Sequence, residues 1–552
     1  MVSHRYSGPI SCVFFYHISA SGKPWCVSAQ FQRYFSDVSA GRVSSRAFTE
    51  RYHYGSCYTR AVILDRAKLT EVLGTEVPSG VRGVGGVTHD SRCAEPGFAF
   101  VAVPGFKRDG TEFAPEAFRR GASLVVAERD VPGVPTAVVA DARGSLAVLA
   151  REVNGDPSRS MQVYGVTGTN GKTTTSYALH AILAGAYGQD ECGLMTTAET
   201  ISGGERHRSV RTTPEATEVQ GTLASMLESG VRRVVMEVSS HGLSLRRVAG
   251  TRFAGAIFTN LTRDHLDLHG SMEDYYAAKR GLFYMTEGPR LANADDVYGR
   301  RLAAEVEDVS TFGSTAGADY RIAGVETTRR GTGFALHHHE GVLELQTPLL
   351  GPYNVLNVAG AASLALAVGT DEGAVSRAVR RMGQVPGRFE RIAAAGEYGF
   401  EVVVDYAHTD VGLDAVLRVA RGVAGGPDGS RGRVICVFGA AGERDRAKRP
   451  KMGRVASLLA DMSLITTDDA YSEDPGKIAR EVEAGSDLSR TSIELDRRKA
   501  IRRALEVARA GDVVVVAGKG HETVQHLPEG DVPFHDAMVV RELLEEIGNK
   551  GR

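Results

Sequence analysis

The stretch MQVYGVTGTNGKTTTSYALHAILAG, residues 161–185, decides the fold of this chain. It begins with a short apolar run, passes through a turn with Gly168 and Gly171, and continues as a helical segment from Lys172. A strand, a glycine-rich turn and a helix in this order place backbone N–H groups around phosphate oxygens, with a lysine as point charge and a threonine hydroxyl for magnesium. We therefore predict a phosphate loop, although Val166 replaces the first glycine of the usual pattern G-x-x-x-x-G-K-[ST].

The alternation of strands and helices continues on both sides of this loop. Short runs rich in β-branched residues end in glycine, polar or acidic residues, and helical segments such as 448–461 lie between them. The runs are SLVVAE (123–128), VRRVVMEVSS (231–240), GAIFTN (255–260), EVVVDYAH (401–408), RVICVFGA (433–440) and DVVVVAGKG (512–520). This order is typical of α/β proteins with parallel sheets, whose ligands collect at the carboxyl ends of the strands. The glycine-rich segment 421–433 is predicted to be a surface loop.

Length and composition narrow the class of protein. A chain of 552 residues exceeds a single hydrophobic core and predicts several domains. The formal net charge of -2 argues against an extended nucleic-acid-binding face, and no apolar run approaches the roughly 18 residues of a membrane-spanning helix. The six cysteines show no metal-binding or disulfide-framework spacing. We expect a cytoplasmic protein without nucleic acid and without membrane insertion.

The first 61 residues differ from the rest. They contain three of the six cysteines and the only tryptophan, Trp25, without helical or strand periodicity. The apolar patch ISCVFFYHI (10–18) suggests a signal peptide, but no small-residue cleavage site follows it. We predict that 1–61 is a disordered extension or reflects a misassigned start, with translation beginning near Val62, and we assign it no function.

The motif G-T-N-G-K-T-T without the early glycine resembles the Mur ligase family, ATP-dependent enzymes that add amino acids to the cell-wall precursor. Folylpolyglutamate synthetases are related to this family. The resemblance covers about 62–552 and continues in order through nine further motifs. These are DSRCAEPGFAFVAVPGFKRDG (90–110), TTPEA (212–216), MEVSSHGL (236–243), FTNLTRDHLDLHGSMEDYYAAK (258–279), NADD (293–296), VPGRFE (385–390), VDYAHT (404–409), GERDRAKRPKMG (442–453) and AGKGHE (517–522).

The resemblance implies three α/β domains after the extension 1–61. An N-terminal domain, 62–158, would bind the UDP precursor. A central domain, 159–385, would contain a parallel sheet of the phosphate-loop ATPase type, and a Rossmann-like C-terminal domain, 386–552, would bind the amino acid.

The resemblance also implies an ATP site with two magnesium ions. The expected ATP-binding residues are Gly168, Thr169, Asn170, Gly171, Lys172, Thr173, Thr174, Asn293, Arg388 and Asp405. The expected catalytic residues are Lys172, Glu237, His265 and Lys279, with Thr173, Glu237, His265 and Lys279 as metal ligands. In this family the lysine that matches Lys279 carries a CO2-derived carbamate. A lysine reacts with CO2 only as a free amine, which burial beside cations can produce by lowering its pKa.

By the same resemblance, the UDP-muramoyl dipeptide would contact five residues: Ser91, Thr212, Thr213, Ser239 and Arg247. The sequence departs from the common family pattern at Leu245, where glutamine is frequent, and at Arg211, where asparagine is common. Both departures affect contacts to the sugar-peptide, away from the reaction centre.

The incoming amino acid would be bound by Arg444, Asp468, Asp469, Tyr471, Gly518 and Glu522. Members of the family that use meso-2,6-diaminopimelate resemble D-N-P-R where this chain reads Asp468-Asp469-Ala470-Tyr471. An arginine can clamp a second carboxylate bidentately, whereas a tyrosine supplies no charge. We therefore predict L-lysine or ornithine as the added amino acid. meso-2,6-Diaminopimelate remains the alternative, since a nearby arginine or lysine could replace the missing one.

The implied activity is the ATP-dependent addition of the third peptide residue, a diamino acid, to UDP-N-acetylmuramoyl-L-Ala-D-Glu through an acyl phosphate, by a monomeric enzyme of peptidoglycan synthesis. Phosphoryl transfer needs positioning and charge neutralisation more than a protein nucleophile. The alternatives are folylpolyglutamate synthesis, which the motifs at 90–110 and 442–453 disfavour, and a non-catalytic protein that holds the UDP precursor. A GTPase is disfavoured because no guanine-binding N-K-x-D occurs.

Overall fold

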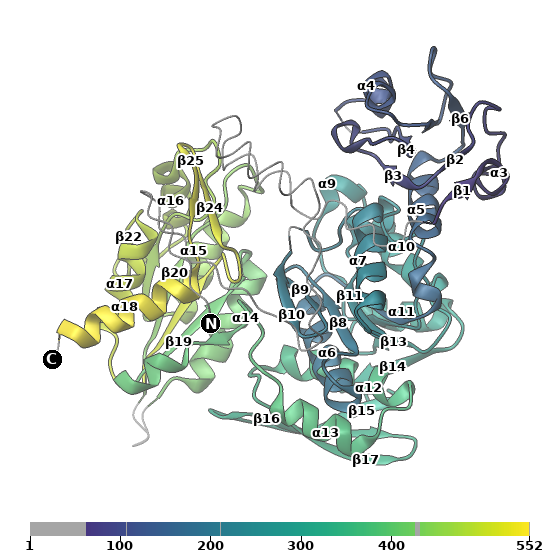
Figure 1. Ribbon diagram of the computed structural model, residues 1–552. Coiled ribbons are helices and arrows are strands. Elements are labelled where there is room, and N and C mark those ends of the chain that lie inside the picture. Colours follow the sequence, from purple (N-terminus) through teal and green to yellow (C-terminus); the bar gives the residue numbers. More distant parts are fainter. Residues whose placement is uncertain (1–61, 106, 210, 426–430, 551–552) are drawn as a thin grey trace, which may run out of the picture. The chain divides into compact units, whose positions relative to one another are not determined.

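The computed structural model describes residues 62–105, 107–209, 211–425 and 431–550, apart from the side chains of Asp267 and Lys550 (Figure 1). The prediction for residues 1–61 lies outside the described residues.

The N-terminal segment contains a four-stranded parallel sheet in the order β3-β4-β5-β6 and a small antiparallel pair, β1-β2. Its elements are β1 Leu64–Asp65, α3 Arg66–Leu73, β2 Gly83–Val84, β3 Gly86–Thr88, η1 Ser91–Cys93, β4 Phe98–Val101, η2 Gly110–Phe113, α4 Ala114–Arg119, β5 Leu124–Ala127, β6 Thr136–Val138, α5 Ala142–Val153 and η3 Pro157–Arg159. All four side chains of β5 are buried, as expected for a parallel strand covered on both faces.

The central segment is organised around one sheet of eleven strands, in the order β10-β9-β8-β11-β7-β12-β13-β14-β15-β16-β17. Its strands are β7 Gln162–Thr167, β8 Cys192–Met195, β9 Glu199–Ser202, β10 Glu205–Arg208, β11 Arg233–Glu237, β12 Gly255–Phe258, β13 Arg290–Asn293, β14 Val309–Gly313, β15 Tyr320–Thr328, β16 Gly331–His338 and β17 Gly341–Thr347. The middle strands, β8 through β15, are parallel, and antiparallel strands extend the sheet at both edges. The phosphate-loop strand β7 lies between β11 and β12, so the ends of all three strands meet at one edge.

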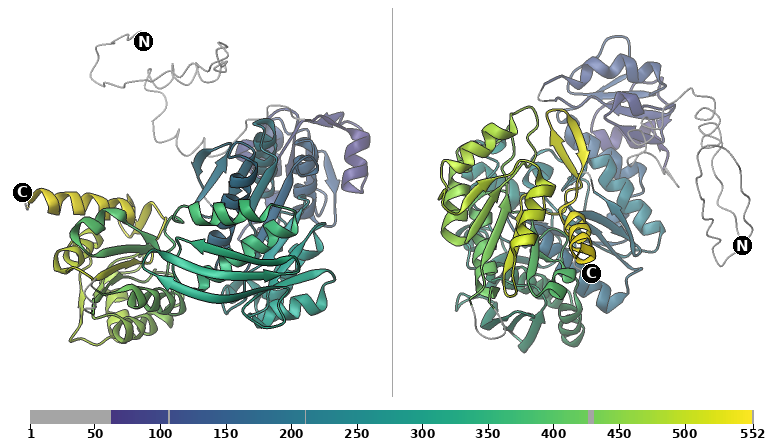
Figure 2. Two further views of the ribbon diagram at one scale, coloured as in Figure 1. Left: turned by 90° about the horizontal axis from the view of Figure 1, so that it is seen from below. Right: turned by 90° about the vertical axis from the view of Figure 1, so that its left-hand side faces the viewer.

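Helices cover both faces of this sheet. They are α6 Lys172–Tyr187, α7 Ala216–Glu228, α8 Ser240–Ser244, α9 Leu266–His269, α10 Met272–Tyr284, α11 Val297–Glu305, α12 Pro352–Ala367 and α13 Glu372–Arg381. Alternate side chains of β7 point to opposite faces. Tyr164 and Val166 pack in the cluster formed by α6, α12 and α13, whereas Val163 packs with α7 and α10. Helix α13 lies on the strand β17 (Figures 1 and 2).

The C-terminal segment has a six-stranded sheet in the order β18-β19-β23-β20-β21-β22, parallel except for β18. Its elements are β18 Glu390–Arg391, η4 Ala393–Tyr398, β19 Glu401–Asp405, α14 Asp410–Val423, β20 Val434–Phe438, α15 Lys448–Leu459, β21 Met462–Ile465, α16 Pro475–Glu483, β22 Thr491–Ile493, α17 Arg497–Val507, β23 Val513–Ala517, β24 Val524–Leu527, β25 Gly530–Pro533 and α18 Asp536–Lys550. Helices α14, α15 and α16 pack on one face, and α17 and α18 on the other. The loops after β19, β20, β21 and β23 leave the sheet at the carboxyl ends of neighbouring parallel strands.

The expected α/β class with parallel sheets is confirmed, and every strand quoted from the sequence is present. Two features differ. The antiparallel strands β16 and β17 lie outside the runs quoted from the sequence, and α14 continues to Val423, into the segment expected to be a loop. Val423 is buried in the core beside α14, which explains why the helix continues there. Within the described residues, no helix is both long and apolar enough to cross a membrane.

Candidate functional site

The phosphate loop joins β7 to α6 and needs glycine at two positions. Gly168 and Gly171 have φ values of +148° and +85°. A Cβ atom on Gly168 would lie 1.9 Å from Thr259 Oγ1, and one on Gly171 would lie 2.2 Å from Asn357 Oδ1. Both glycines therefore allow close packing that any side chain would prevent.

Two lysines converge on one carbonyl of this loop. Lys172 Nζ donates to Gly168 O at 3.1 Å and to Thr169 O at 2.9 Å, and Lys279 Nζ donates to Gly168 O at 2.7 Å. Burial lowers the pKa of Lys172, although Glu237 partly opposes this. The pKa of Lys279 lies well below its usual value because of burial and then the neighbouring charge of Lys172. The geometry brings together two predicted residues that are far apart in the sequence.

The remaining loop residues are anchored from neighbouring elements. The hydroxyl groups of Thr169 and Tyr275 are 3.1 Å apart, and Asn170 N donates to Asn260 Oδ1 at 3.0 Å. Thr173 and Thr174 are buried in the first turn of α6.

Glu237 ends β11, next to the phosphate-loop strand, and its side chain is fully buried. Thr197 donates to both carboxylate oxygens of Glu237: the Thr197 N–H donates to Oε1 at 3.1 Å, and the Thr197 hydroxyl donates to Oε2 at 3.2 Å. A buried carboxylate and the buried hydroxyl of Thr173 offer hard oxygen atoms, the donors that Mg²⁺ prefers. The donor set therefore fits a magnesium ion.

His265 differs from these buried groups. It has a φ of +51°, and nearly half of its side chain is exposed. Its ring lies 4.9 Å from that of His241 and 6.2 Å from that of Tyr275, measured between ring centroids. Since Tyr275 contacts the phosphate loop, His265 lies beside the loop, on its exposed side.

The residues expected to hold the dipeptide form a connected group, apart from Ser91. Thr213 Oγ1 donates to Glu237 O at 3.0 Å and accepts from Ser239 N at 3.0 Å. Arg247 Nη1 donates to Thr213 O at 3.1 Å. Thr212 lies between β10 and α7, and its hydroxyl oxygen is 2.9 Å from Thr197 Oγ1. This group is therefore joined directly to the main-chain carbonyl of Glu237 and, through Thr197, to its carboxylate.

Ser91 lies in the N-terminal segment, at the start of η1. It is buried, and its hydroxyl donates to Glu116 Oε2 at 3.1 Å.

Asn293 and Asp405, which are expected to bind ATP, make hydrogen bonds with main-chain groups. Asn293 Nδ2 donates to Thr259 O at 2.8 Å. Asp405 accepts from Phe389 N at 2.6 Å and from Ala407 N at 2.7 Å, so its carboxylate fixes the segment that carries Arg388. Burial raises the pKa of Asp405, and Arg388 opposes this.

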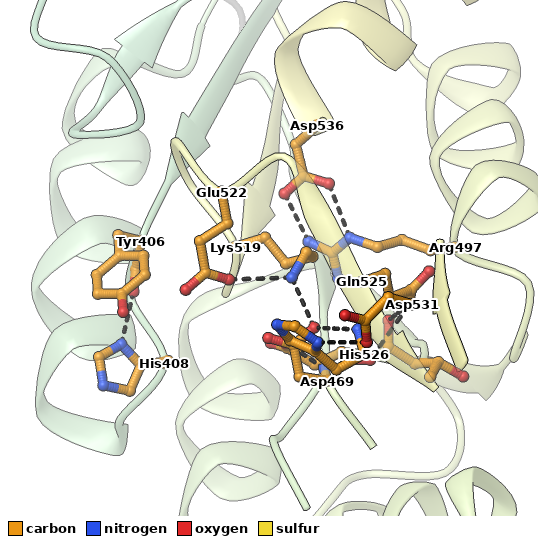
Figure 3. A network of polar contacts seen from close by, with 12 residues as sticks. Tyr406, His408, Asp469, Arg497, Lys519, Glu522, Gln525, His526, Asp531 and Asp536 are labelled. Carbon is orange, nitrogen blue, oxygen red and sulfur yellow. Dashed lines mark hydrogen bonds and ion pairs between the residues drawn. The ribbon is translucent and has the colours of Figure 1, made fainter. Parts of the chain in front are cut away.

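Acidic side chains gather at the carboxyl ends of β21 and β23 (Figure 3). Lys519 Nζ donates to Asp469 Oδ1 at 2.7 Å and to Glu522 Oε2 at 3.0 Å. Asp468 is buried, and its Oδ2 has no hydrogen-bond partner among the described residues. A Cβ on Gly518 would lie 2.3 Å from that oxygen. One oxygen of this buried carboxylate thus has an unused hydrogen-bond acceptor capacity among the described residues.

Positive charge lies next to this acidic group. The Arg444 guanidinium is 5.5 Å from the Tyr471 ring centroid. The Tyr471 ring stacks on His526 with a centroid distance of 5.2 Å, and His526 Nδ1 lies 2.7 Å from Asp531 Oδ1. Carboxylates and a guanidinium side by side are suited to a ligand with both an ammonium and a carboxylate.

Several residues of this region were not identified from the sequence. Lys519 lies inside the quoted motif AGKGHE, but only the fold shows that its side chain turns inward. Arg497 makes a fully buried bidentate pair with Asp536, at 2.7 Å for each contact, and also donates to Ala517 O. These two residues are far apart in the sequence, which offers no signal for their pairing. His408 lies in the quoted motif VDYAHT and was given no role.

A phosphate loop followed by a second α/β unit with an acidic pocket defines a nucleotide-dependent enzyme of the α/β class. Comparison with known proteins narrows the class. The chain matches the Mur ligase family, catalytic domain, over residues 83–154, the Mur ligase middle domain over 166–365, and the Mur ligase, glutamate ligase domain over 387–520. The chain belongs to the Mur ligase family, whose members are ATP-dependent enzymes that form a peptide bond.

Individual relatives support the assignment to this family. The UDP-N-acetylmuramoyl-L-alanyl-D-glutamate--2,6-diaminopimelate ligase of Gloeobacter violaceus is 41% identical over 475 residues, 85% of this chain and 95% of the relative. A solved structure of a ligase with the same name is 30% identical, with a TM-score of 0.65, and the match covers 88% of this chain and 100% of that one. The MurF ligase from Thermotoga maritima in complex with ADP, 20% identical with a TM-score of 0.55, shares the fold over 84% of this chain and 98% of its own.

The prediction of L-lysine or ornithine as the added amino acid is wrong. The Gloeobacter relative and three others at 40 to 41% identity are all named for 2,6-diaminopimelate. The prediction rested on the missing arginine at residue 471, although Arg444 was itself expected to bind the amino acid. In the structure, Arg444 lies beside the Tyr471 ring, so the pocket contains a guanidinium although residue 471 is a phenol.

Proposed function

We propose that this chain joins 2,6-diaminopimelate to the D-glutamate carboxylate of UDP-N-acetylmuramoyl-L-alanyl-D-glutamate, with conversion of ATP to ADP and phosphate. The relatives' names support the two substrates, and the ADP bound to a structural neighbour supports ATP. The observation that carries the proposal is a pair of features in the same group of loops: Asp468 has a buried carboxylate oxygen without a hydrogen-bond partner among the described residues, and the Arg444 guanidinium lies beside the ring of Tyr471. Diaminopimelate, which has an ammonium and a carboxylate at each end, suits such a combination of charges.

The phosphate loop then supports transfer of the γ-phosphoryl group to the substrate carboxylate. Backbone N–H groups of the loop and the Lys172 ammonium face the phosphate oxygens. Thr173, Glu237, His265 and Lys279 would hold magnesium, and a bound magnesium ion neutralises phosphate charge. The acyl phosphate that forms is attacked by the amine of diaminopimelate, and phosphate leaves as the peptide bond forms.

Lys279 has the property that carbamate formation requires. Its amine is buried against a carbonyl, and burial together with Lys172 lowers its pKa, which raises the fraction of free amine above that of an exposed lysine. Reaction with CO2 would convert this nitrogen into an anion next to the phosphate loop.

The remaining expectations stand as part of the proposal. Domain boundaries at 62–158, 159–385 and 386–552 are supported by family matches that fall inside them. The free thiols of Cys93, Cys192 and Cys436 fit a cytoplasmic enzyme. Sedimentation analysis tests the expected monomer.

The test of the function is product formation, measured by mass spectrometry with ATP and UDP-N-acetylmuramoyl-L-alanyl-D-glutamate. We expect a tripeptide product with 2,6-diaminopimelate and little or none with L-lysine or ornithine. Binding of the UDP precursor without turnover of any amino acid would instead identify a non-catalytic homologue.

A further inference from the structure

His408, in the loop that follows β19, has a defined tautomer. Its Nδ1 lies 2.9 Å from Tyr406 O (Figure 3). A carbonyl oxygen only accepts hydrogen bonds, so Nδ1 carries the proton and donates it. In the uncharged ring the lone pair is then on Nε2. His408 is half-buried, and within the described part of the chain no hydrogen bond occupies Nε2. The ring therefore presents a proton acceptor.

The surroundings of His408 keep the ring uncharged. Burial lowers its pKa, and the Lys448 ammonium lowers it further, while the Tyr406 carbonyl and Asp468 oppose the shift and Arg388 adds to it. Lys448 Nζ donates to His408 O at 2.8 Å, which holds this cation beside the loop. A neutral imidazole at physiological pH can accept a proton, whereas an imidazolium cannot.

His408 is connected by contacts both to the phosphate loop and to the residues expected to bind the amino acid. Its ring is 4.8 Å from that of Tyr406, and the Arg388 guanidinium lies 4.5 Å from the same tyrosine ring. Arg388 Nη2 in turn reaches Thr173 Oγ1, at 3.5 Å, in the phosphate loop. On the other side, Tyr406 is close enough to Glu522 that this carboxylate contributes to the raised pKa of the phenol. A short series of contacts thus joins His408 to both the phosphate loop and the amino-acid pocket.

The reaction needs a base at this place. An amino acid arrives with its amine protonated, and the nitrogen has no lone pair for attack until one proton is removed. The carboxylates of the pocket bind the ammonium form, which stabilises the proton on the amine. A neutral acceptor next to them is suited to remove it.

We propose that His408 is the general base of the amide-forming step, an inference that rests on the proposed function. Nε2 accepts one proton from the substrate ammonium, and the freed lone pair forms the C–N bond at the acyl-phosphate carbonyl carbon. The C–O bond to phosphate then breaks, phosphate leaves with its electron pair and takes up the second amine proton, and the imidazolium returns its proton to water. Lys448 is a positioning residue, since its ammonium already donates to His408 O.

The test compares two nucleophiles in His408→Asn, whose side-chain amide can still donate to Tyr406 O but cannot act as a base. Diaminopimelate must lose a proton, whereas hydroxylamine is uncharged at neutral pH and traps acyl phosphates as hydroxamates. We expect kcat with diaminopimelate to fall by about 10²- to 10⁴-fold. Hydroxamate formation, which also requires ATP and the UDP precursor, should stay within about threefold of wild type. His339→Gln, an exposed histidine on the β16–β17 turn, is the matched control and should change neither rate.

The outcomes separate the alternatives. Equal losses of both reactions would show that His408 supports folding or ATP use and would overturn the inference, as would an unchanged rate with diaminopimelate. A wild-type enzyme that forms neither product would overturn the proposed function and this inference with it. A further expected result is that the residual rate of His408→Asn rises with pH as the free amine fraction grows, which a purely structural defect would not produce.

Discussion

Lys279 in the central segment and Lys519 in the C-terminal segment are both buried, with relative exposures of 1% and 0%. Their pKa values nevertheless move in opposite directions. Lys279 donates to a carbonyl, and burial together with the neighbouring charge of Lys172 lowers its pKa, which Asp264 opposes only in part. Burial also acts to lower the pKa of Lys519, but Asp468, Glu522 and Asp469 outweigh it and the pKa is raised.

The difference shows that burial alone does not decide the charge of a lysine. In a low-dielectric environment the charged form is costly unless carboxylates compensate it. Lys519 has carboxylate partners that favour its ammonium form, and it donates hydrogen bonds to Asp469 and Glu522 at the amino-acid site. Lys279 has no carboxylate among its hydrogen-bond partners, and its lowered pKa favours the neutral amine. Lys519 is therefore a structural residue, whereas Lys279 is suited to a chemical role.

The largest effect is expected from replacing Lys279, which tests the different roles assigned to the two buried lysines. Lys279→Met should reduce kcat by at least about 10²- to 10³-fold, because it removes a group at the phosphate end of the site. Unfolding in urea should change little. In Lys279→Ala, whose small side chain leaves space at this position, short-chain carboxylic acids should restore part of the activity if the lost carbamate is the only defect. Failure of this rescue would indicate a structural role for the lysine.

The second largest effect is expected at the buried pair of Arg497 and Asp536. Arg497→Met leaves Asp536 charged in the core, and we expect a loss of about 3–5 kcal/mol in the free energy of unfolding. Urea denaturation monitored by circular dichroism measures this. A loss below about 1 kcal/mol would contradict the assigned burial.

Lys519→Met should destabilise the C-terminal segment by roughly 3 kcal/mol, less than Arg497→Met because Glu522 is partly exposed and can be rehydrated. The pH dependence gives an independent check. Since the folded pKa of Lys519 is raised, its stabilisation is complete below the unfolded pKa of about 10.4 and is lost only as the pH rises through the folded value. The difference in stability between wild type and variant should therefore be constant near neutrality and shrink in strongly alkaline solution.

A smaller effect is expected at the rim of the pocket. Arg444→Met removes the guanidinium next to Tyr471 and should raise KM for diaminopimelate by about 10- to 100-fold, as for the loss of hydrogen bonds to a charged group. Steady-state kinetics with each substrate varied in turn measures this, and KM for ATP should stay constant. An unchanged KM for diaminopimelate would show that another group binds its carboxylate.

The smallest effect is expected at the exposed ion pair of Lys68 and Glu71, joined at 2.8 Å on α3. Water and salt screen such a pair, so Glu71→Gln should leave Tm unchanged within the error of calorimetry. A clear fall in Tm would show that this small helix depends on its surface charges.

The phosphate loop could be predicted almost completely because its residues are contiguous. Gly168, Gly171 and Lys172 stand together in the sequence, and strand, turn and helix follow in the expected order. The contact between Lys279 and Gly168 could not be derived, since 111 residues separate them and only the packing of α10 brings them together.

The amino-acid site was less predictable because its residues, like Lys279 and Gly168, are far apart in the sequence. Tyr471 and Arg444 lie in two separate loops and His526 lies in β24, so the side chain at residue 471 alone does not determine the charge around the site. Strand β16, GTGFALHH, is not among the β-branched runs quoted from the sequence, and its side chains alternate between buried and partly exposed along most of the strand.

The measurement that tests the central comparison most directly is ¹³C NMR of the protein in ¹³C-labelled bicarbonate. We predict a carbamate resonance in the wild type that disappears in Lys279→Met and persists in Arg444→Met, which leaves both buried lysines in place. A spectrum without a carbamate resonance, or one whose resonance survives in Lys279→Met, would contradict the account that Lys279 is the buried lysine available as a free amine.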